Sequence, residues 1–330
     1  MPDFEPTDFL PAASWENLRL RAGLLTRLRD FFARHDFLEV ETPLLSADTV
    51  IDRHLDPLSV TLFDDPRTPD VGRRMWLQTS PEFAMKRLLA AGADRIYQVT
   101  RAFRGAESGA HHNPEFTMVE WYRVGDSMAT GMALLGELAC ELLGADRVSR
   151  ISYGEAFQRF VDVDPHAATE KELAVAARSH GVATPDDMPK DDRDGWLNLL
   201  LATLVEPKLG IARPEILYDY PASQAALAQV RADKPPVAER FELYANGVEL
   251  ANGYHELLDP SVLRERNRQA NRQRRTDGKC VLPEDSRLIA AMEHGLPDCV
   301  GVALGFDRLV MIAAGATSLS EVMAFPIDRA

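Results

Sequence analysis

The sequence predicts a globular chain of the α+β class, with an antiparallel sheet flanked by helices, and three observations support this. Residues 95–100 and 116–122 alternate and are rich in strand formers, so they predict two antiparallel strands joined by a polar loop. Residues 14–32 have helical spacing, and residues 126–213 are rich in alanine and leucine. A hydrophobic content of 45% in 330 residues is enough for a substantial core.

The first predicted helix begins after Ser14, a residue type that is favoured as a helix cap. Its apolar residues recur at steps of three and four positions, which predicts one buried face. This face comprises Leu18, Ala22, Leu25, Leu28 and Phe32.

The predicted hairpin contains residues suited to a nucleotide. Side chains two apart on a strand share a face, so Glu120 and Tyr122 should point the same way and Trp121 the other way. Arg104 stands where the first strand ends, and a guanidinium there could clamp a phosphate while Phe116 offers a ring to a purine. A surface hairpin with ordinary ion pairs is the alternative at this point.

Residues from about 126 to 213 are interpreted as a helical insertion. Two apolar runs, 132–144 and 196–210, are separated by a polar segment at 185–194 and carry no recognisable chemistry. Residues 214–221 then return the chain to a strand. The basic run 264–275 (RERNRQANRQRR) is either a solvated helix face or a docking surface for an acidic protein partner.

Charge and cysteine content narrow the class of protein. A net charge of −14 argues against nucleic acid as the main partner, because phosphate binding needs a concentrated basic surface. The widely spaced Cys140, Cys280 and Cys299 lack metal-ligand spacing, and we expect buried thiols in a reducing cytoplasm. The first ten residues lack the features of an export signal, and no run of about 18 apolar residues predicts a membrane span.

Three ordered motifs give the chain a family resemblance. Residues 101–122 (RAFRGAESGAHHNPEFTMVEWY) are similar to motif 2 of class II aminoacyl-tRNA synthetases, in the form found in lysyl-tRNA synthetases. Residues 37–43 (FLEVETP) resemble motif 1, and residues 301–308 (GVALGFDR) resemble motif 3. The resemblance implies a class II synthetase-like catalytic domain that forms a homodimer through motif 1.

Within that family the chain resembles the short paralogues of lysyl-tRNA synthetase that modify translation elongation factor P. The similarity runs nearly end to end and includes residues 79–92, 237–257, 295–311 and 325–330. Motif 1 begins near residue 37, which leaves no room for the N-terminal oligonucleotide-binding barrel of lysyl-tRNA synthetases. We therefore expect one catalytic domain over residues 1–330, with the insertion at about 126–213 and without an anticodon-binding domain.

The resemblance implies an activity. The chain would activate (R)-β-lysine with ATP as the adenylate and transfer it to the ε-amino group of one lysine on elongation factor P, with no tRNA expected. Two alternatives stay open: a free-standing lysine-activating ligase with another acceptor, such as a small molecule or tRNA, and a non-catalytic paralogue that binds an amino acid. Intact Arg104, Glu249, Asn252 and Arg308 argue against the second.

The resemblance also assigns the ATP site. Arg104 and Arg308 are the implied catalytic residues, which would hold the α- and γ-phosphates because charge must be neutralised on both sides of the reacting phosphorus. Phe116 would stack on the adenine face opposite Arg308, and His112 would lie toward the phosphates. The same motif usually has Glu two residues after the first arginine, in contact with the adenine edge; Ala106 stands there, and Glu107 is the expected substitute for that contact.

Metal and amino-acid ligands follow from the same resemblance. Glu249 and Asn252 would bind Mg²⁺ together with ATP, since both offer hard oxygen ligands. Several carboxylates converging on one cavity suit a doubly cationic amino acid, because buried carboxylates need positive charge. The implied pocket comprises Ser80, Glu82, Glu120, Tyr122 and Glu256, with Glu256 and Tyr122 at the terminal ammonium. Ala303 stands where lysyl-tRNA synthetases have glycine and would narrow that pocket.

Overall fold

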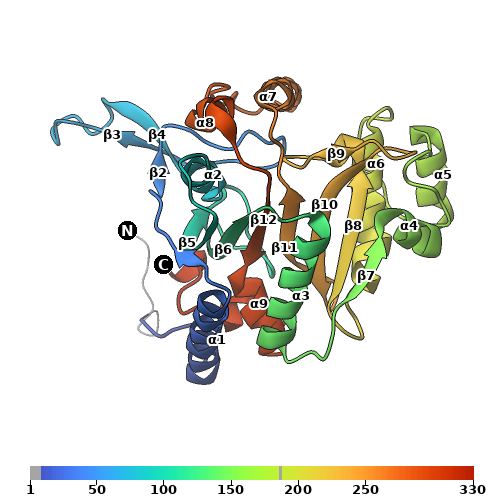
Figure 1. The fold of residues 1–330 in the computed structure, drawn as a ribbon, viewed down its shortest axis with the longest axis horizontal. Helices are drawn as coiled ribbons and strands as arrows, with labels where there is room; N and C mark the ends of the chain where they lie inside the picture. The colour runs from blue at the N-terminus through green and yellow to red at the C-terminus, as the bar shows by residue number, and fades with distance from the viewer. Residues whose placement is uncertain (1–8, 186–187) are drawn as a thin grey trace. The chain divides into compact units, whose positions relative to one another are not determined.

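The computed structural model describes residues 9–185 and 188–330, and its contacts divide the chain into two compact units (Figure 1). The first comprises the described residues up to Gly125 together with Leu258–Asp298 and Ala303–Ala330. The second comprises Asp126–Leu257 and Cys299–Val302. The expectation of one catalytic domain stays a prediction. The N-terminal segment 1–8 and residues 186–187 of the predicted polar segment lie outside the described residues.

The first unit is built on the predicted hairpin. Strands β5 (Arg95–Phe103) and β6 (Glu115–Val124) pair antiparallel from Arg95↔Arg123 to Phe103↔Glu115, and β1 (Leu38–Glu39) pairs parallel with β5. A separate small antiparallel sheet has the order β2-β4-β3. Its strands are β2 (Leu45–Ser46), β3 (Ser59–Leu62) and β4 (Arg73–Leu77). The predicted antiparallel hairpin is confirmed.

The helices of the first unit include the predicted helix that begins after Ser14. They are α1 (Trp15–Arg34), α2 (Glu82–Ala90), α7 (Pro260–Thr276), α8 (Arg287–Gly295) and α9 (Phe306–Ala313), with 3₁₀ turns at Leu319–Glu321 and Ile327–Arg329. Strand β12 (Cys299–Gly305), which contains most of the motif 3 segment, leads into α9; its residues up to Val302 belong to the second unit.

Helix α1 has the predicted cap but only part of the predicted buried face. The Ser14 side chain accepts from the Asn17 backbone N–H at 3.1 Å. The fully buried residues are Leu24, Leu28, Phe31 and Phe32, whereas Ala22 is exposed and Leu18 and Leu25 are half-buried. The predicted face is therefore confirmed at Leu28 and Phe32 and wrong toward the start of the helix, because Leu24–Leu25 and Phe31–Phe32 are apolar neighbours that fit either of two registers.

The second unit contains the predicted insertion, which is mostly but not wholly helical. Its helices are α3 (Met128–Leu143), α4 (Tyr153–Val161), α5 (Glu170–Ser179) and α6 (Arg193–Leu200), followed by a π-helical turn at Leu201–Val205 and 3₁₀ turns at Glu206–Lys208 and Ala222–Gln224. Strand β7 (Ser149–Ser152) interrupts the helices and pairs parallel with β8 (Glu215–Pro221). The sequence did not predict β7, because its partner lies more than 60 residues away.

The remaining strands of the second unit form antiparallel pairs. β10 (Val237–Ala245) lies between β8 and β11 (Val248–His255), β12 follows β11 in the order, and β9 (Val230–Arg231) pairs with β10. A core of aromatic and aliphatic residues, including Tyr153, Phe157 and Tyr244, is buried between β8, β10 and the helices α4–α6.

The cysteines and the basic run differ in part from expectation. All three cysteines are free, but only Cys299 is buried, and Cys280 is exposed.

In the basic run, Arg264 pairs with Glu293 at 2.6 Å and Arg272 pairs with Glu265 at 2.8 Å. Among the described residues, no helix is long and apolar enough to cross a membrane.

Candidate active site

Arg104 lies directly after β5, where the sequence placed it. Its guanidinium lies over the Phe116 ring, 5.0 Å from the centroid, and its Nε atom is buried without a hydrogen-bond partner in the described chain. The Arg104 backbone N–H donates to the Pro114 carbonyl at 2.9 Å, which closes the loop between the strands. The structure therefore brings together the two residues predicted to hold phosphate and adenine.

Arg308 and His112 meet at the same loop. Arg308 is in the first turn of α9; its Nη2 lies 2.6 Å from His112 Nε2, and its Nε donates to the His111 carbonyl at 3.1 Å. A guanidinium can only donate, so His112 Nε2 is the acceptor and the imidazole proton is on Nδ1. Burial and the nearby Arg308, His111 and Arg104 lower the pKa of His112 to about 4. His112 is therefore neutral near pH 7.

The loop departs from the family pattern at a strained position. Ala106 has a φ of 63°, a left-handed conformation that is costly for a residue with a Cβ atom. It is exposed, and the adjacent Glu107 is half-buried. The contact of Glu107 with the adenine edge stays a prediction.

Four predicted pocket residues lie together in the first unit. Tyr122 Oη donates to Glu120 Oε1, and Ser80 Oγ donates to Glu120 Oε2 at 2.7 Å. The Glu82 backbone N–H donates to Ser80 Oγ at 3.0 Å, which connects the start of α2 to β6. Trp121 points the opposite way and packs against Phe32, with ring centroids 5.3 Å apart. The predicted faces of β6 are confirmed.

Burial dominates the electrostatics of this pocket. It raises the pKa of Glu120 to about 7, and the Glu82 carboxylate adds to the effect, while hydrogen bonds from Tyr122 and Ser80 oppose it. Lys86, one turn after Glu82 on α2, places its Nζ 2.5 Å from Glu82 Oε1. Sequence analysis missed Lys86, although its spacing of four residues from Glu82 on a helix was available.

Glu249 and Asn252 are brought to one face by a β-bulge in the second unit. They are three residues apart, so a regular strand would point them to opposite sides. The register, however, shifts between Glu242↔Asn252 and Tyr244↔Glu249. Because Glu242 and Tyr244 share a face and directly opposite residues face the same way, the extra residue places Glu249 and Asn252 together. Asn252 Oδ1 is buried without a hydrogen-bond partner in the described chain.

Glu242 is a further buried carboxylate that sequence analysis did not single out. It lies directly opposite Asn252 and accepts from Tyr220 at 2.5 Å, Tyr244 at 2.6 Å and Arg240 at 2.5 Å. The available signal was a glutamate between two apolar neighbours, Phe241 and Leu243, in a strand. Across residues 9–185 and 188–330, no group of three or more His, Cys, Asp or Glu side chains is arranged to hold a metal ion by itself.

Glu256 and Ala303 are the other two residues predicted to line the amino-acid pocket. Glu256 is 1% exposed at the end of β11, and its backbone N–H donates to the Cys299 carbonyl at 3.0 Å. Ala303 is half-buried in β12. Their places in the amino-acid pocket stay predictions.

Comparisons with known proteins define the class to which this fold and these residues belong. A family model of tRNA synthetases of class II (D, K and N) matches residues 7–329. The chain belongs to this family of class II tRNA synthetases, and the predicted fold class is confirmed.

Curated relatives are similar along their whole lengths. The chain is 47% identical to the elongation factor P–(R)-β-lysine ligase of Yersinia enterocolitica over 326 residues, 99% of each chain. It is 46% identical to the ligase of that name from Salmonella paratyphi A, again over 99% of each chain. For the Edwardsiella ictaluri protein of that name the identity is 48% over 97% of this chain and 98% of the relative. The predicted ligase class is confirmed, and the family implies use of ATP.

Proposed function

We propose that this protein activates (R)-β-lysine with ATP as an adenylate and transfers it to the ε-amino group of a lysine on elongation factor P. The observation that carries the proposal is the buried carboxyl of Glu120, held by Ser80 and Tyr122 beside Glu82, in a chain similar end to end to ligases of that name. A buried acidic pocket of this kind suits a substrate with two amino groups.

Within this pocket the groups have separate tasks. Glu82 already faces the Lys86 ammonium, whereas the hydrogen bonds to Glu120 come from the neutral hydroxyl groups of Ser80 and Tyr122. We assign Glu120 to one substrate ammonium, with Ser80 and Tyr122 fixing its orientation. Tyr122 and Glu256 would serve the terminal ammonium, and Ala303 would limit the space beside the reacting carboxylate.

The cationic loop is suited to ATP. During activation the substrate carboxylate oxygen attacks the α-phosphorus, the bond to the bridging oxygen breaks, and pyrophosphate leaves. Arg104 would stabilise charge on the α-phosphate and Arg308 on the γ-phosphate, with neutral His112 donating from Nδ1 and Phe116 and Glu107 at the adenine. The buried, unpartnered Nε of Arg104 fits a phosphate acceptor.

Glu249 and Asn252 would hold Mg²⁺ with the ATP phosphates. The bulge gives them one face, and the unpartnered Asn252 Oδ1 is a hard oxygen ligand of the type that Mg²⁺ prefers. The ion, when bound, supplies further neutralisation of phosphate charge.

Transfer requires little more than a positioned acceptor. The neutral amine of the acceptor lysine attacks the adenylate carbonyl carbon, an amide bond forms, and AMP leaves with the electron pair of the acyl–phosphate bond. The net charge of −14 supports a protein acceptor over tRNA. We further propose that residues 1–330 form one catalytic domain, acting in the cytoplasm.

A homodimer is proposed through the motif 1 segment. Leu38 in β1 is 63% exposed and Trp15 at the start of α1 is 67% exposed, which leaves apolar surface for a second copy. Leu28 and Phe32 are buried within the chain, so they cannot report on assembly. Sedimentation of Leu38→Glu tests this: a stable dimer in that variant would contradict the proposed interface.

Two measurements test the proposed function. Pyrophosphate exchange with (R)-β-lysine and α-lysine detects activation and separates an enzyme from a non-catalytic paralogue. Intact mass spectrometry of purified elongation factor P should then show the gain of one β-lysyl group. Efficient charging of lysine tRNA with no mass gain on the factor would overturn the proposal.

A further inference from the structure

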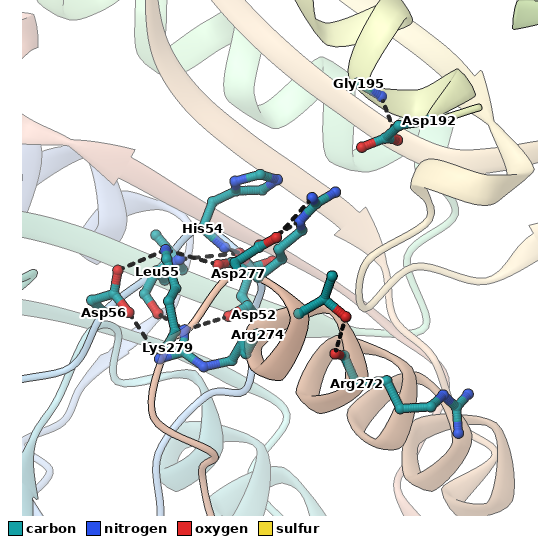
Figure 2. A network of polar contacts seen from close by, with 12 residues as sticks. Asp52, His54, Leu55, Asp56, Asp192, Gly195, Arg272, Arg274, Asp277 and Lys279 are labelled. Carbon is teal, nitrogen blue, oxygen red and sulfur yellow. Dashed lines mark hydrogen bonds and ion pairs between the residues drawn. The ribbon is translucent and has the colours of Figure 1, made fainter. Parts of the chain in front are cut away.

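Arg274 differs from the rest of the basic run because it is buried. Its side chain is 2% exposed at the C-terminal end of α7, whereas that of Arg272 is 58% exposed. The guanidinium donates to the Asp52 and Leu55 carbonyls, each at 2.9 Å, and to Asp56 Oδ1 at 2.8 Å (Figure 2). It also donates to the Cys280 carbonyl at 2.9 Å. One buried cation therefore ties the segment 52–56 to the end of α7.

Asp56 is held from two sides. Lys279 Nζ donates to Asp56 Oδ2 at 2.8 Å and to the Arg53 carbonyl at 3.0 Å (Figure 2). Burial alone would raise the pKa of Asp56, but hydrogen bonds from Lys279 and Arg274 outweigh it and hold the pKa below its usual value. The carboxylate is thus fixed as an anion between two cations.

The same segment supports the loop that carries Arg104. The Gly105 backbone N–H donates to the Asp56 carbonyl at 2.7 Å. A Cβ atom on Gly105 would lie 3.1 Å from that oxygen and 3.3 Å from Leu58 Cδ2, so a methyl group there would force a neighbouring atom to shift by a few tenths of an ångström. The position of the residue after Arg104 therefore depends on where Asp56 is held.

We propose that Arg274 and Asp56 are positioning residues for the ATP site: they fix the segment 52–58, and through Gly105 they place the guanidinium of Arg104 against the nucleotide phosphates. This inference rests on the proposed function. Neither residue is a catalytic residue, because each acts on the site through the backbone of another segment. A misplacement of about 1 Å at a reacting group can cost about a hundredfold in rate.

The first test compares arginines on one helix. In Arg274→Met we expect kcat for pyrophosphate exchange to fall about ten- to a hundredfold and KM for ATP to rise. KM for the amino acid should change less than about twofold, because Ser80 and Glu120 are held by separate contacts. Arg274→Lys should restore part of the rate, since it keeps the charge but not the planar fork. The exposed Arg272→Met is the control and should match the wild type.

The second test approaches the contact from the loop and applies even where Arg274→Met folds poorly. Gly105→Ala inserts a methyl against Asp56 and Leu58, while Gly109→Ala in the same loop meets no atom within 4 Å. We expect only Gly105→Ala to raise KM for ATP. Combined with Arg274→Lys, its effects should be less than multiplicative, because both variants disturb one contact.

Hydrogen exchange separates this inference from the proposed function. The Gly105 amide should lose protection in Arg274→Lys and keep it in Arg272→Met, whatever reaction the protein catalyses. Unchanged protection, or well-folded Arg274 and Gly105 variants with wild-type kinetics, would overturn the positioning role. A wild type that lacks pyrophosphate exchange but shows the expected loss of protection would overturn the proposed function alone.

Discussion

The two ends of the proposed substrate site in the first unit carry charges of opposite sign. At the phosphate end, Arg104 and Arg308 place two positive charges beside the neutral His112. At the amine end, Glu82 and Glu120 gather negative charge between α2 and β6, where burial is deeper. Each end drives one of its titratable groups toward the neutral form.

The shifts in pKa show this directly. His112 has a pKa lowered to about 4 by burial and neighbouring cations, and Glu120 has a pKa raised to about 7 by burial and a neighbouring carboxylate. A ligand of the opposite charge reverses each shift. The comparison suggests that ATP binding and amine binding are separable, and the following predictions test that separation.

The largest effect is expected at the phosphate end. Arg104→Ala or Arg308→Ala should reduce pyrophosphate exchange by about a hundredfold or more, since each removes charge stabilisation of the transition state. The fold should be retained. Arg101→Ala is the matched control, because this exposed arginine of the same hairpin pairs only at 3.6 Å with Glu115. More than about a tenth of wild-type activity in either variant, a loss below about 1.4 kcal/mol, would refute the assigned role.

The second largest effect, on KM for the amino acid, is expected at the amine end. Glu120→Gln should raise KM for the amino acid about ten- to a hundredfold, because a charged hydrogen bond is worth about 1.5–3 kcal/mol, while KM for ATP stays unchanged. Glu115→Gln, exposed on the same strand, is the control. An equal rise in both KM values would break the proposed separation.

The pH dependence of the same residue gives an independent measurement. Below a pH of about 7 the Glu120 carboxyl carries a proton that must leave when an ammonium binds, so kcat/KM for the amino acid should fall as the pH drops from 8 to 6. Because the pKa of Glu120 is higher in the folded protein than its ordinary value of 4.5, this group contributes to the folding stability of the ligand-free protein fully below pH 4.5. That contribution is lost as the pH rises through about 7. A pH profile in Glu120→Gln identical to that of the wild type would exclude Glu120 as its source.

The sequence was informative where a pattern is local. Strands β5 and β6 follow from alternation, the α1 cap follows from Ser14, and the shared face of Glu120 and Tyr122 follows from a period of two. The family resemblance supplied the roles of residues in these elements. It also led to Glu249 and Asn252, although only the bulge explains how residues three apart share a face.

The sequence was uninformative where a residue's environment comes from distant segments. Arg274 lies in a basic run that suggests a solvated face, but carbonyl groups more than 200 positions earlier in the chain bury it. Strand β7 has only four residues and a distant partner. The register of α1 was ambiguous because apolar residues occur in adjacent pairs, so that tertiary packing alone selects the buried face.

A smaller effect on specificity is expected at Ala303. Ala303→Gly should raise kcat/KM for α-lysine relative to (R)-β-lysine by at least about tenfold, because one methyl group in a tight pocket is worth about 1–3 kcal/mol. KM for ATP should not change. If Ala303 serves only strand packing, stability or overall rate will fall while the ratio of the two substrates stays constant. Both substrates should be measured on one preparation by pyrophosphate exchange.

The smallest effect is expected at Ala106, where the phosphate-end loop departs from its family. A left-handed conformation costs a non-glycine residue about 1–2 kcal/mol, and glycine avoids most of this cost. Glycine also loses more conformational entropy on folding, by about 0.4–1 kcal/mol, so Ala106→Gly should stabilise the protein by no more than about 1.6 kcal/mol. Ala110→Gly is the matched control in the same exposed loop.

These two loop variants should differ in sign. Ala110 lacks a positive φ, so glycine there brings the entropic cost without relief of strain, and the thermal midpoint should fall by about 1–2 °C while that of Ala106→Gly rises. Exchange activity should be retained in both, because Glu107 rather than Ala106 is assigned to the adenine. A loss of ATP affinity confined to Ala106→Gly would show instead that the strained backbone itself orients Glu107, which would make the loop at the phosphate end as rigidly specified as the buried pocket at the amine end.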